Sequence, residues 1–228
     1  MSQPDHPDAT PPHAPGGAAA PATPAHTTGE SGLVVPYGPA DDGVPALALY
    51  EDLRCPYCAA MERSSGATIR AFADAGRLRL EYHFATFLDG MLGGRGSRTA
   101  LGALGAAVNE GQAEFKALHE ALYANQPEER DDAYGDPAGL LAVARSVHTG
   151  TGAGGLGSDA FRQAVQDGGY LPWAGAVAEA FERSGIRGTP ALRLGEQDVH
   201  AFSRDGKPLS GQEVAPQIEA ALSAHASG

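Results

Sequence analysis

The chain has 228 residues, the length of one sizeable domain, and a chain of this length can bury enough surface to fold without a disulfide scaffold. Lysine and arginine number 16 against 28 aspartate and glutamate, so the formal net charge is −12. This acidic balance, with no basic stripe, argues against nucleic-acid binding and against adhesion to anionic membranes. No run of 18 apolar residues occurs, so we expect no membrane segment.

The first 32 residues are rich in Pro, Ala and Thr and contain almost no large apolar side chains. Such a stretch cannot offset its ordering entropy, so we predict a disordered tail at 1–32 and a folded domain at 33–228. Its histidines, His6, His13 and His26, are expected to bind no metal specifically. The opening MSQPDHPDATPPH lacks the basic and apolar regions of a secretory signal. We therefore expect a cytoplasmic location, with export only if the true start lies upstream.

The folded part opens with strand and helix signals in the order of a crossover unit. We predict strands at 33–35, 46–50 and 78–84 and, between the last two, a helix over 58–75. Pro56 lies at the first turn of that helix, where proline is favoured. Strand, helix and strand in this order indicate two parallel strands joined by a right-handed crossover.

The stretch from 97 to 185 contains no convincing strand. Its apolar periodicity predicts five helices, at 100–109, 113–125, 137–148, 159–166 and 172–184. Strand character returns at 190–194, followed by a predicted hairpin turn at 195–198, a strand at 199–202 and a closing amphipathic helix at 212–224. The sequence therefore predicts an α/β domain with a helical insertion.

The two cysteines, Cys55 and Cys58, are separated by Pro56 and Tyr57 at the junction of a predicted strand and helix. Random placement gives this spacing in roughly 1% of cases. A helix N-terminus favours an anion, so we expect Cys55 to be an accessible thiolate of lowered pKa that attacks disulfides. Cys58, one turn further on and more buried, would resolve the mixed disulfide.

Two other interpretations of the cysteine pair remain, a static structural disulfide and a chance pair of buried thiols. A structural zinc site would need a second pair of ligands, and the sequence has no further C-x-x-C and no His-x-x-x-His. The pair is thus best interpreted as redox-active.

A second motif, GIRGTPAL at 185–192, places Thr189 and Pro190 directly before a predicted strand. Together with LYEDLRCPYC at 49–58, it resembles the thioredoxin-like superfamily, in particular the DsbA-type thiol-disulfide oxidoreductases, whose thioredoxin core carries a helical insertion. The resemblance covers about residues 32–224. It implies that Pro190 is cis and lies against the cysteines, that the backbone of Thr189 pairs with substrate, and that no metal or organic cofactor is required.

Two positions depart from the pattern of this family. Many relatives carry a buried carboxylate six residues before the first cysteine, where this chain has Leu49. Glu51 and Asp52 are nearer and could substitute for it, but we favour a solvated strand end for each, which leaves the proton of Cys58 without an assigned acceptor. The dipeptide Pro-Tyr replaces the Pro-His of strong DsbA oxidants, which predicts a less oxidising cysteine pair.

Other candidate residues carry weaker signals. His83 and His119 could act as bases, but a single histidine on a strand or helix is usually structural. Trp173 could belong to an aromatic client-binding surface, although core packing is the favoured interpretation. Four apolar residues near the end of the 78–84 strand could line a groove, with the same preference for packing: Phe84, Phe87, Met91 and Leu92.

The sequence therefore predicts a thiol-disulfide oxidoreductase that cycles Cys55 and Cys58 between dithiol and disulfide. Its partners would be protein thiol or disulfide clients and a second redox protein that resets it. One alternative is a non-catalytic thioredoxin-fold module that holds a client or a soft metal such as Cu(I), although only three methionines are present. Another is a glutathione-using transferase or isomerase, a class that in this superfamily characteristically lacks the second cysteine.

Overall fold

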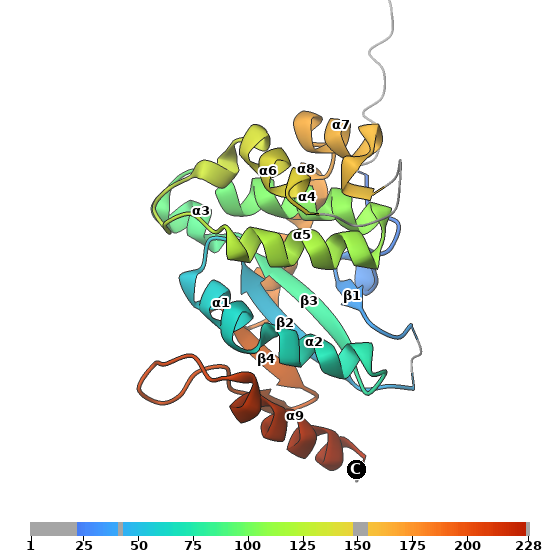
Figure 1. Cartoon of the computed structure of the whole chain (residues 1–228), viewed down its shortest axis with the longest axis vertical. Coiled ribbons are helices and arrows are strands. Elements are labelled where there is room, and N and C mark those ends of the chain that lie inside the picture. The colour runs from blue at the N-terminus through green and yellow to red at the C-terminus, as the bar shows by residue number, and fades with distance from the viewer. Residues whose placement is uncertain (1–21, 41–42, 148–154, 227–228) are drawn as a thin grey trace, which may run out of the picture.

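The computed structural model describes residues 22–40, 43–147 and 155–226. Within them, one mixed sheet is formed by β1 (Val35–Tyr37), β2 (Ala46–Asp52), β3 (Arg79–Ala85), β4 (Ala191–Leu194) and β5 (Gln197–Val199). The spatial order is β1-β3-β2-β4-β5 (Figure 1). β2 and β3 are parallel, as the crossover pattern predicts, and the other neighbouring strands are antiparallel.

The helical connection from β2 to β3 is interrupted, whereas the sequence predicts one continuous helix. It consists of α1 (Pro56–Met61), a π-helical turn η2 (Glu62–Gly66) and α2 (Ala67–Asp74). Within the turn, Glu62 and Gly66 are buried, and a Cβ on Gly66 would collide with the Glu62 carboxylate. Glycine thus leaves the space that this carboxylate occupies. Isolated π-helical turns of this kind are frequent at functional sites.

The insertion is helical throughout its described part, as predicted. After β3 come α3 (Phe87–Leu92), α4 (Gly96–Glu110), α5 (Gln112–Ala124), η3 (Ala133–Gly135), α6 (Pro137–Arg145), η4 (Gly155–Gly157), α7 (Asp159–Asp167) and α8 (Leu171–Arg183). The sequence predictions correspond to α4 to α8, with residue 148 outside the described part, whereas α3 was not predicted. Figure 1 shows α4 to α7 gathered at one end of the sheet. The closing helix is α9 (Gly211–His225).

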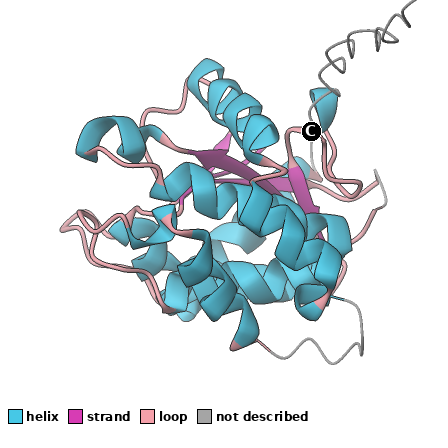
Figure 2. Cartoon of the chain, turned by 90° about the horizontal axis from the view of Figure 1, so that it is seen from above, coloured by secondary structure: helices cyan, strands magenta, loops and turns pink. Residues whose placement is uncertain are grey.

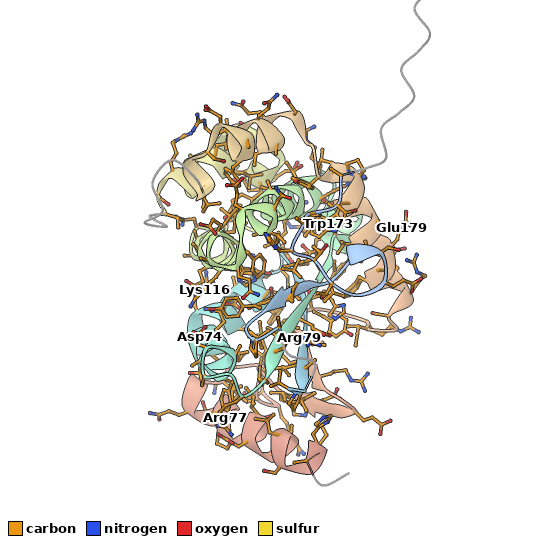
Figure 3. All side chains as sticks on the ribbon, turned by 90° about the vertical axis from the view of Figure 1, so that its right-hand side faces the viewer. Asp74, Arg77, Arg79, Lys116, Trp173 and Glu179 are labelled. Atoms are coloured by element: carbon orange, nitrogen blue, oxygen red, sulfur yellow. The ribbon has the colours of Figure 1, made fainter. Side chains whose placement is uncertain are left out.

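Helices cover both faces of the sheet (Figure 2). Tyr50 contacts Phe181 of α8 with ring centroids 6.2 Å apart, so α8 covers one face. Tyr82 points to the opposite face, where it contacts His119 of α5 at 4.9 Å. On that side α2 also packs on α9. Figure 3 shows Lys116 of α5 above Asp74 of α2, an ion pair of 3.5 Å between insertion and core.

The edge strands differ from the sequence predictions. β1 begins at Val35 and continues through Pro36, which an edge strand tolerates because its N–H side needs no partner. β5 begins at Gln197, because the hairpin turn contains only Gly195 and Glu196. The φ of +59° at Gly195 lies in the left-handed region that favours glycine.

The predicted tail is shorter than expected. Residues 22–32 are described and pack on the domain: η1 (Glu30–Gly32) is followed by Val34, which pairs with Thr28 in a β-bridge. The indole Nε1 of Trp173 donates to the carbonyl of Gly32 at 2.8 Å. The boundary at residue 32 was therefore placed too late. The rest of the predicted tail, 1–21, with two of its three histidines, lies outside the described residues. None of the described helices has the length and apolarity to cross a bilayer.

Candidate active site

The structure brings the two sequence motifs together. Cys55 is the N-cap of α1, and its thiol donates to the backbone oxygen of Thr189 at 3.3 Å, across 134 residues of sequence. The peptide bond between Thr189 and Pro190 is cis, as the family resemblance implied. Both cysteines are free thiols. Cys55 is only 6% exposed, less than expected for a loop tip, and Cys58 is fully buried.

The two thiols have opposite acidities. The pKa of Cys55 is lowered to about 7, chiefly by a hydrogen bond from the Cys58 thiol and further by the side chain of Thr189 and by the N–H groups of Cys58 and Tyr57. Burial opposes these effects without cancelling them. Burial is also the main cause that raises the pKa of Cys58 well above its ordinary value. At neutral pH a large share of the outer sulfur is therefore thiolate, whereas the inner one stays protonated.

The dipeptide between the cysteines faces outward. Pro56 occupies the first turn of α1, as predicted. Tyr57 is 58% exposed, although its ring lies edge-on to Phe202 with centroids 5.5 Å apart. An exposed aromatic ring beside a nucleophile offers apolar contact to an approaching chain.

The interpretation of Glu51 and Asp52 as a solvated strand end is wrong. Both residues are fully buried, because β2 stays paired with β3 as far as Asp52 opposite Ala85 and the insertion covers the strand ends. The Oε2 atom of Glu51 lies 2.7 Å from Nε2 of His119, which is also fully buried. Glu51 and His119 are thus brought together at the base of the active site, although sequence analysis assigned a site role to neither.

A buried polar cluster surrounds this contact. Glu62 pairs with the guanidinium of Arg70, whose Nε lies 2.8 Å from the half-exposed Glu120. Burial raises the pKa of Glu51 to about 8 and lowers that of His119 to about 4. Because the pKa of Glu51 is about 8, its carboxyl group holds a proton at neutral pH. The cluster therefore stores a proton inside the molecule.

The same residues have donors that a metal ion could use. One ligand atom from each of Glu51, Glu62 and His119 lies within 4.8 Å of the others. The guanidinium of Arg70, however, already supplies the positive charge beside Glu62 that a cation would bring. We therefore assign a proton, and no metal, to this cluster.

The proton-storing cluster acts on the inner cysteine. The charge of Glu51 raises the pKa of Cys58, and the backbone N–H of Asp52 donates to the Cys58 sulfur when this is ionised. Tyr123 adds a hydroxyl that donates to the Asp52 carbonyl at 3.4 Å. The end of β2 thus provides the surroundings of Cys58.

Asp52 itself connects the strand to the insertion. Its carboxylate accepts hydrogen bonds from the backbone N–H of Arg54 at 3.0 Å, from Ser97 Oγ at 2.6 Å and from the N–H of Leu88 at 3.2 Å. Burial raises its pKa to about 6 in spite of these bonds. Three satisfied hydrogen bonds identify Asp52 as a positioning residue for the loop that carries Cys55.

Arg54, the residue before Cys55, is held by two segments that follow β3: helix α3 with its C-cap, and the loop after α5. Its guanidinium pairs with Asp89 at 3.0 Å and donates to the carbonyl oxygens of Gly93 at 2.8 Å and Glu129 at 3.0 Å. The side chain is only 2% exposed. This buried cation therefore anchors the nucleophile loop rather than facing substrate.

The remaining candidates have packing contacts. His83 stacks on Tyr50 with centroids 4.7 Å apart, and burial lowers its pKa. Trp173 is buried, as favoured, and a Cβ on Gly105 would collide with its ring. Phe84 is buried, Phe87 stacks on Phe181 at 5.9 Å, Leu92 is partly buried, and Met91 is 72% exposed. Phe87 and Met91 line a hollow together with Phe181, whereas Phe84 and Leu92 are not part of it.

The family signature described as Thioredoxin matches residues 41–210, which contain both cysteines, the cis proline and the insertion. The chain belongs to the thioredoxin family. Among curated proteins, none matches the sequence of this chain.

Solved structures share the fold of this thioredoxin-family chain at low sequence identity. MdbA, a thiol-disulfide oxidoreductase from Actinomyces oris, is 20% identical, with a TM-score of 0.64 over 82% of this chain and 88% of its own. BdbD from Bacillus subtilis is 19% identical, with a TM-score of 0.63 over 82% and 92%. DsbA from Mycobacterium tuberculosis is 22% identical, with a TM-score of 0.60 over 85% and 99%. The predicted DsbA-like thioredoxin fold is therefore confirmed.

Proposed function

We propose that the protein is a thiol-disulfide oxidoreductase that exchanges its Cys55–Cys58 pair with protein thiols and disulfides. The observation that carries this proposal is the asymmetry of the two thiols. Cys55 has a pKa of about 7 and contacts the Thr189 carbonyl beside the cis proline, whereas Cys58 is buried with a raised pKa. A static disulfide needs no such asymmetry. The neighbouring structures described as thiol-disulfide oxidoreductases support the same activity.

In the oxidising direction, a client thiolate attacks the Cys55 sulfur of the disulfide and expels the Cys58 sulfur as a thiolate. A second client thiolate then attacks the client sulfur of the mixed disulfide and expels Cys55. Two electrons pass from the client to the cysteine pair, and the client gains one disulfide. The reducing direction runs these steps backward, with the Cys55 thiolate as the attacking group.

The buried leaving group needs a proton, because Cys58 has a raised pKa. We assign this proton to Glu51, the nearby carboxyl whose charge acts on Cys58 and whose pKa of about 8 keeps it protonated at neutral pH. In the reducing direction Glu51 first releases its own proton to solvent and then accepts the proton of Cys58 as this sulfur attacks the mixed disulfide. Glu51 thus fills the place of the carboxylate that Leu49 leaves vacant six residues before Cys55.

The clients in this proposal are extended or unfolded polypeptides with an accessible cysteine, since Cys55 is nearly covered and a folded surface reaches it poorly. A second redox protein resets the pair, because a single client turnover leaves it fully reduced or fully oxidised. The neutral dipeptide Pro-Tyr predicts a reduction potential below that of strong DsbA oxidants.

The test combines the reduction potential of the Cys55–Cys58 pair with assays of thiol-disulfide exchange. The reduction potential is measured against glutathione buffers: about −270 mV suits a reductant of a reducing compartment such as the cytoplasm, and about −200 mV or above suits an oxidising one. Oxidation of reduced ribonuclease and reduction of insulin then give the direction. Cys55→Ser should abolish both activities, whereas Ser64→Ala on the same helical segment should retain them.

The outcomes separate the alternatives. A pair that forms no reversible disulfide contradicts the enzyme and favours the binding module. Metal that copurifies under reducing conditions and is lost in Cys55→Ser would identify a soft-metal carrier. Turnover of glutathione adducts that survives in Cys58→Ser would identify a transferase.

A further inference from the structure

Two hollows near Cys55 share one aromatic side chain, that of Phe202. The larger, of about 420 Å³, is lined by the loop that contains the cis proline and by β4 and β5, among them Pro190 and Phe202. The smaller, of about 310 Å³, is lined by Pro56, Tyr57 and Phe202 together with the loop that follows β5. Cys55 contacts Thr189, the neighbour of Pro190 in the larger hollow, and precedes Pro56 of the smaller one. Because the hollows also share Phe202, we treat them as the two halves of one groove that passes Cys55.

The two halves of this groove differ in chemistry. The smaller half is apolar, with the exposed ring of Tyr57 against Phe202. The larger half contains Arg187, Arg193 and His200 against one acid, Asp198. An extended chain that crosses Cys55 would therefore place an apolar side chain on one side and a polar one on the other.

The charge in the larger half is not neutralised within the described residues. Asp198 pairs with Arg193 at 3.2 Å, whereas the exposed Arg187 has neither an ion pair nor a side-chain hydrogen bond in the described part of the chain. Arg204, two residues after Phe202, has none there either, while the neighbouring Lys207 pairs with Asp205 at 2.7 Å. The rim of the groove thus keeps uncompensated positive charge on a chain whose net charge is −12.

We propose that this groove selects client segments that carry an acidic side chain close to the target cysteine. The proposal rests on the proposed thiol-disulfide exchange and names its substrate class. The acidic side chain would pair with Arg187, while an apolar side chain on the other flank of the cysteine would lie against Tyr57. The surrounding negative surface repels acidic chains elsewhere, which makes the groove the favoured place of contact.

The test uses peptides that differ at one position. Synthetic peptides with one cysteine carry Asp, Asn or Lys two residues before or after it, and the rate constant of their reaction with the oxidised protein is measured by stopped flow. An acidic neighbour also changes the intrinsic reactivity of the peptide thiol, so each rate constant is divided by that of the same peptide with glutathione disulfide. We expect the Asp peptide to exceed the Asn peptide by about threefold to fivefold on one flank, the size of one exposed ion pair.

The variants locate this preference. Arg187→Gln should reduce the Asp-to-Asn ratio to about one, as should 0.5 M salt in the wild type. Arg145→Gln removes an exposed arginine from α6, far along the insertion, and should leave the ratio unchanged. Because both arginines are exposed, neither variant is expected to unfold.

Three results would overturn the proposal: an equal Asp-to-Asn ratio in wild type, the same ratio in wild type and Arg187→Gln, or a Lys peptide that reacts as fast as the Asp peptide. Failure of the proposed function looks different. In that case no peptide reacts with the oxidised protein faster than with glutathione disulfide, whatever its charge.

Discussion

Cys55 and Cys58 are three positions apart, yet their surroundings make one an acid near neutrality and the other a very weak one. The pKa of Cys55 is about 7, and its largest cause is the hydrogen bond from Cys58. We therefore expect alkylation of reduced protein by iodoacetamide to rise with pH through 7 and to level off above about pH 8. The rate at each pH is read by mass spectrometry of the labelled Cys55 peptide.

Replacement of the donor tests the cause. In Cys58→Ala the hydrogen bond to Cys55 is lost, so the thiolate is less stable and the alkylation profile moves to higher pH. A profile that stays at pH 7 in this variant would show that the backbone N–H groups, rather than the Cys58 thiol, set the acidity of Cys55.

Glu51 predicts a pH dependence of stability. Its pKa rises from 4.5 to about 8 on folding, so between these values the folded state holds a proton that the unfolded state has released. The contribution of Glu51 to the free energy of unfolding should therefore fall as pH rises from 5 to 8, by up to about 1.4 kcal/mol per pH unit, whereas the lowered pKa of His119 acts in the opposite direction below about pH 6.5. Glu51→Gln stays neutral and should reduce this fall. Urea unfolding of reduced protein at four pH values measures it.

The control is Glu179→Gln, an exposed α8 substitution (Figure 3). Asp52 also has a raised pKa, of about 6, and contributes in every variant below that pH. The test is therefore the difference between Glu51→Gln and wild type in the pH dependence of the free energy of unfolding. Equal pH slopes in these two proteins would contradict a protonated Glu51.

The cysteines could be assigned from the sequence, because their spacing and their place at a helix start are local signals. Glu51 and His119 could not. They lie 68 positions apart, and the insertion that buries both is placed by tertiary packing. A carboxylate next to a strand end is usually solvated, so no local pattern distinguishes Glu51 from that common case. The one available signal was that Leu49 stands where many relatives carry a buried carboxylate.

Helix α1–η2–α2 shows the same limit at the scale of an element. Apolar periodicity predicted a continuous helix, and the helical character is confirmed. The π-helical turn was not predictable, because no local sequence pattern marks it; Glu62, its first residue, forms a buried ion pair with Arg70. α3 was missed since its six residues are too few to show periodicity, whereas the longer α4 and α5 were found.

Gly66 provides a test of this turn. Gly→Ala inside a helix usually stabilises by up to about 1 kcal/mol, but here the new Cβ would displace the Glu62 carboxylate. We expect Gly66→Ala to lower the free energy of unfolding by about 1–3 kcal/mol, as for other overpacked sites. Gly90→Ala in α3 is the matched control, since its Cβ would meet no atom within 4 Å. A stabilised Gly66→Ala would mean that Glu62 has room to move.

At the scale of the whole molecule, the insertion and the thioredoxin core share one hydrophobic cluster. It extends without a break from Leu47 and Leu80 in the sheet to Leu104, Leu118 and Phe161 in the insertion. The sequence indicated an insertion by its length and helical periodicity. That it packs as one body with the core follows from side-chain contacts, which a linear pattern does not reveal.

This continuity predicts cooperative unfolding. Trp173 is the only tryptophan and is 2% exposed within the insertion, so its fluorescence reports the insertion, whereas far-UV circular dichroism reports all helices. We expect the two urea transitions to coincide. A tryptophan transition at lower urea would show that the insertion unfolds independently of the core.

The buried contacts of Arg54 bear on how a partner protein could distinguish the oxidised form of this protein from the reduced form. Its guanidinium binds α3 with its C-cap and the loop after α5, and its neighbour in sequence is Cys55. We therefore expect the insertion to keep its position against the core when a disulfide at this loop forms or breaks. Oxidised and reduced molecules should have the same outline at a distance from Cys55. A partner protein that distinguishes the two forms must therefore contact the groove directly, at the surface next to the Cys55 sulfur.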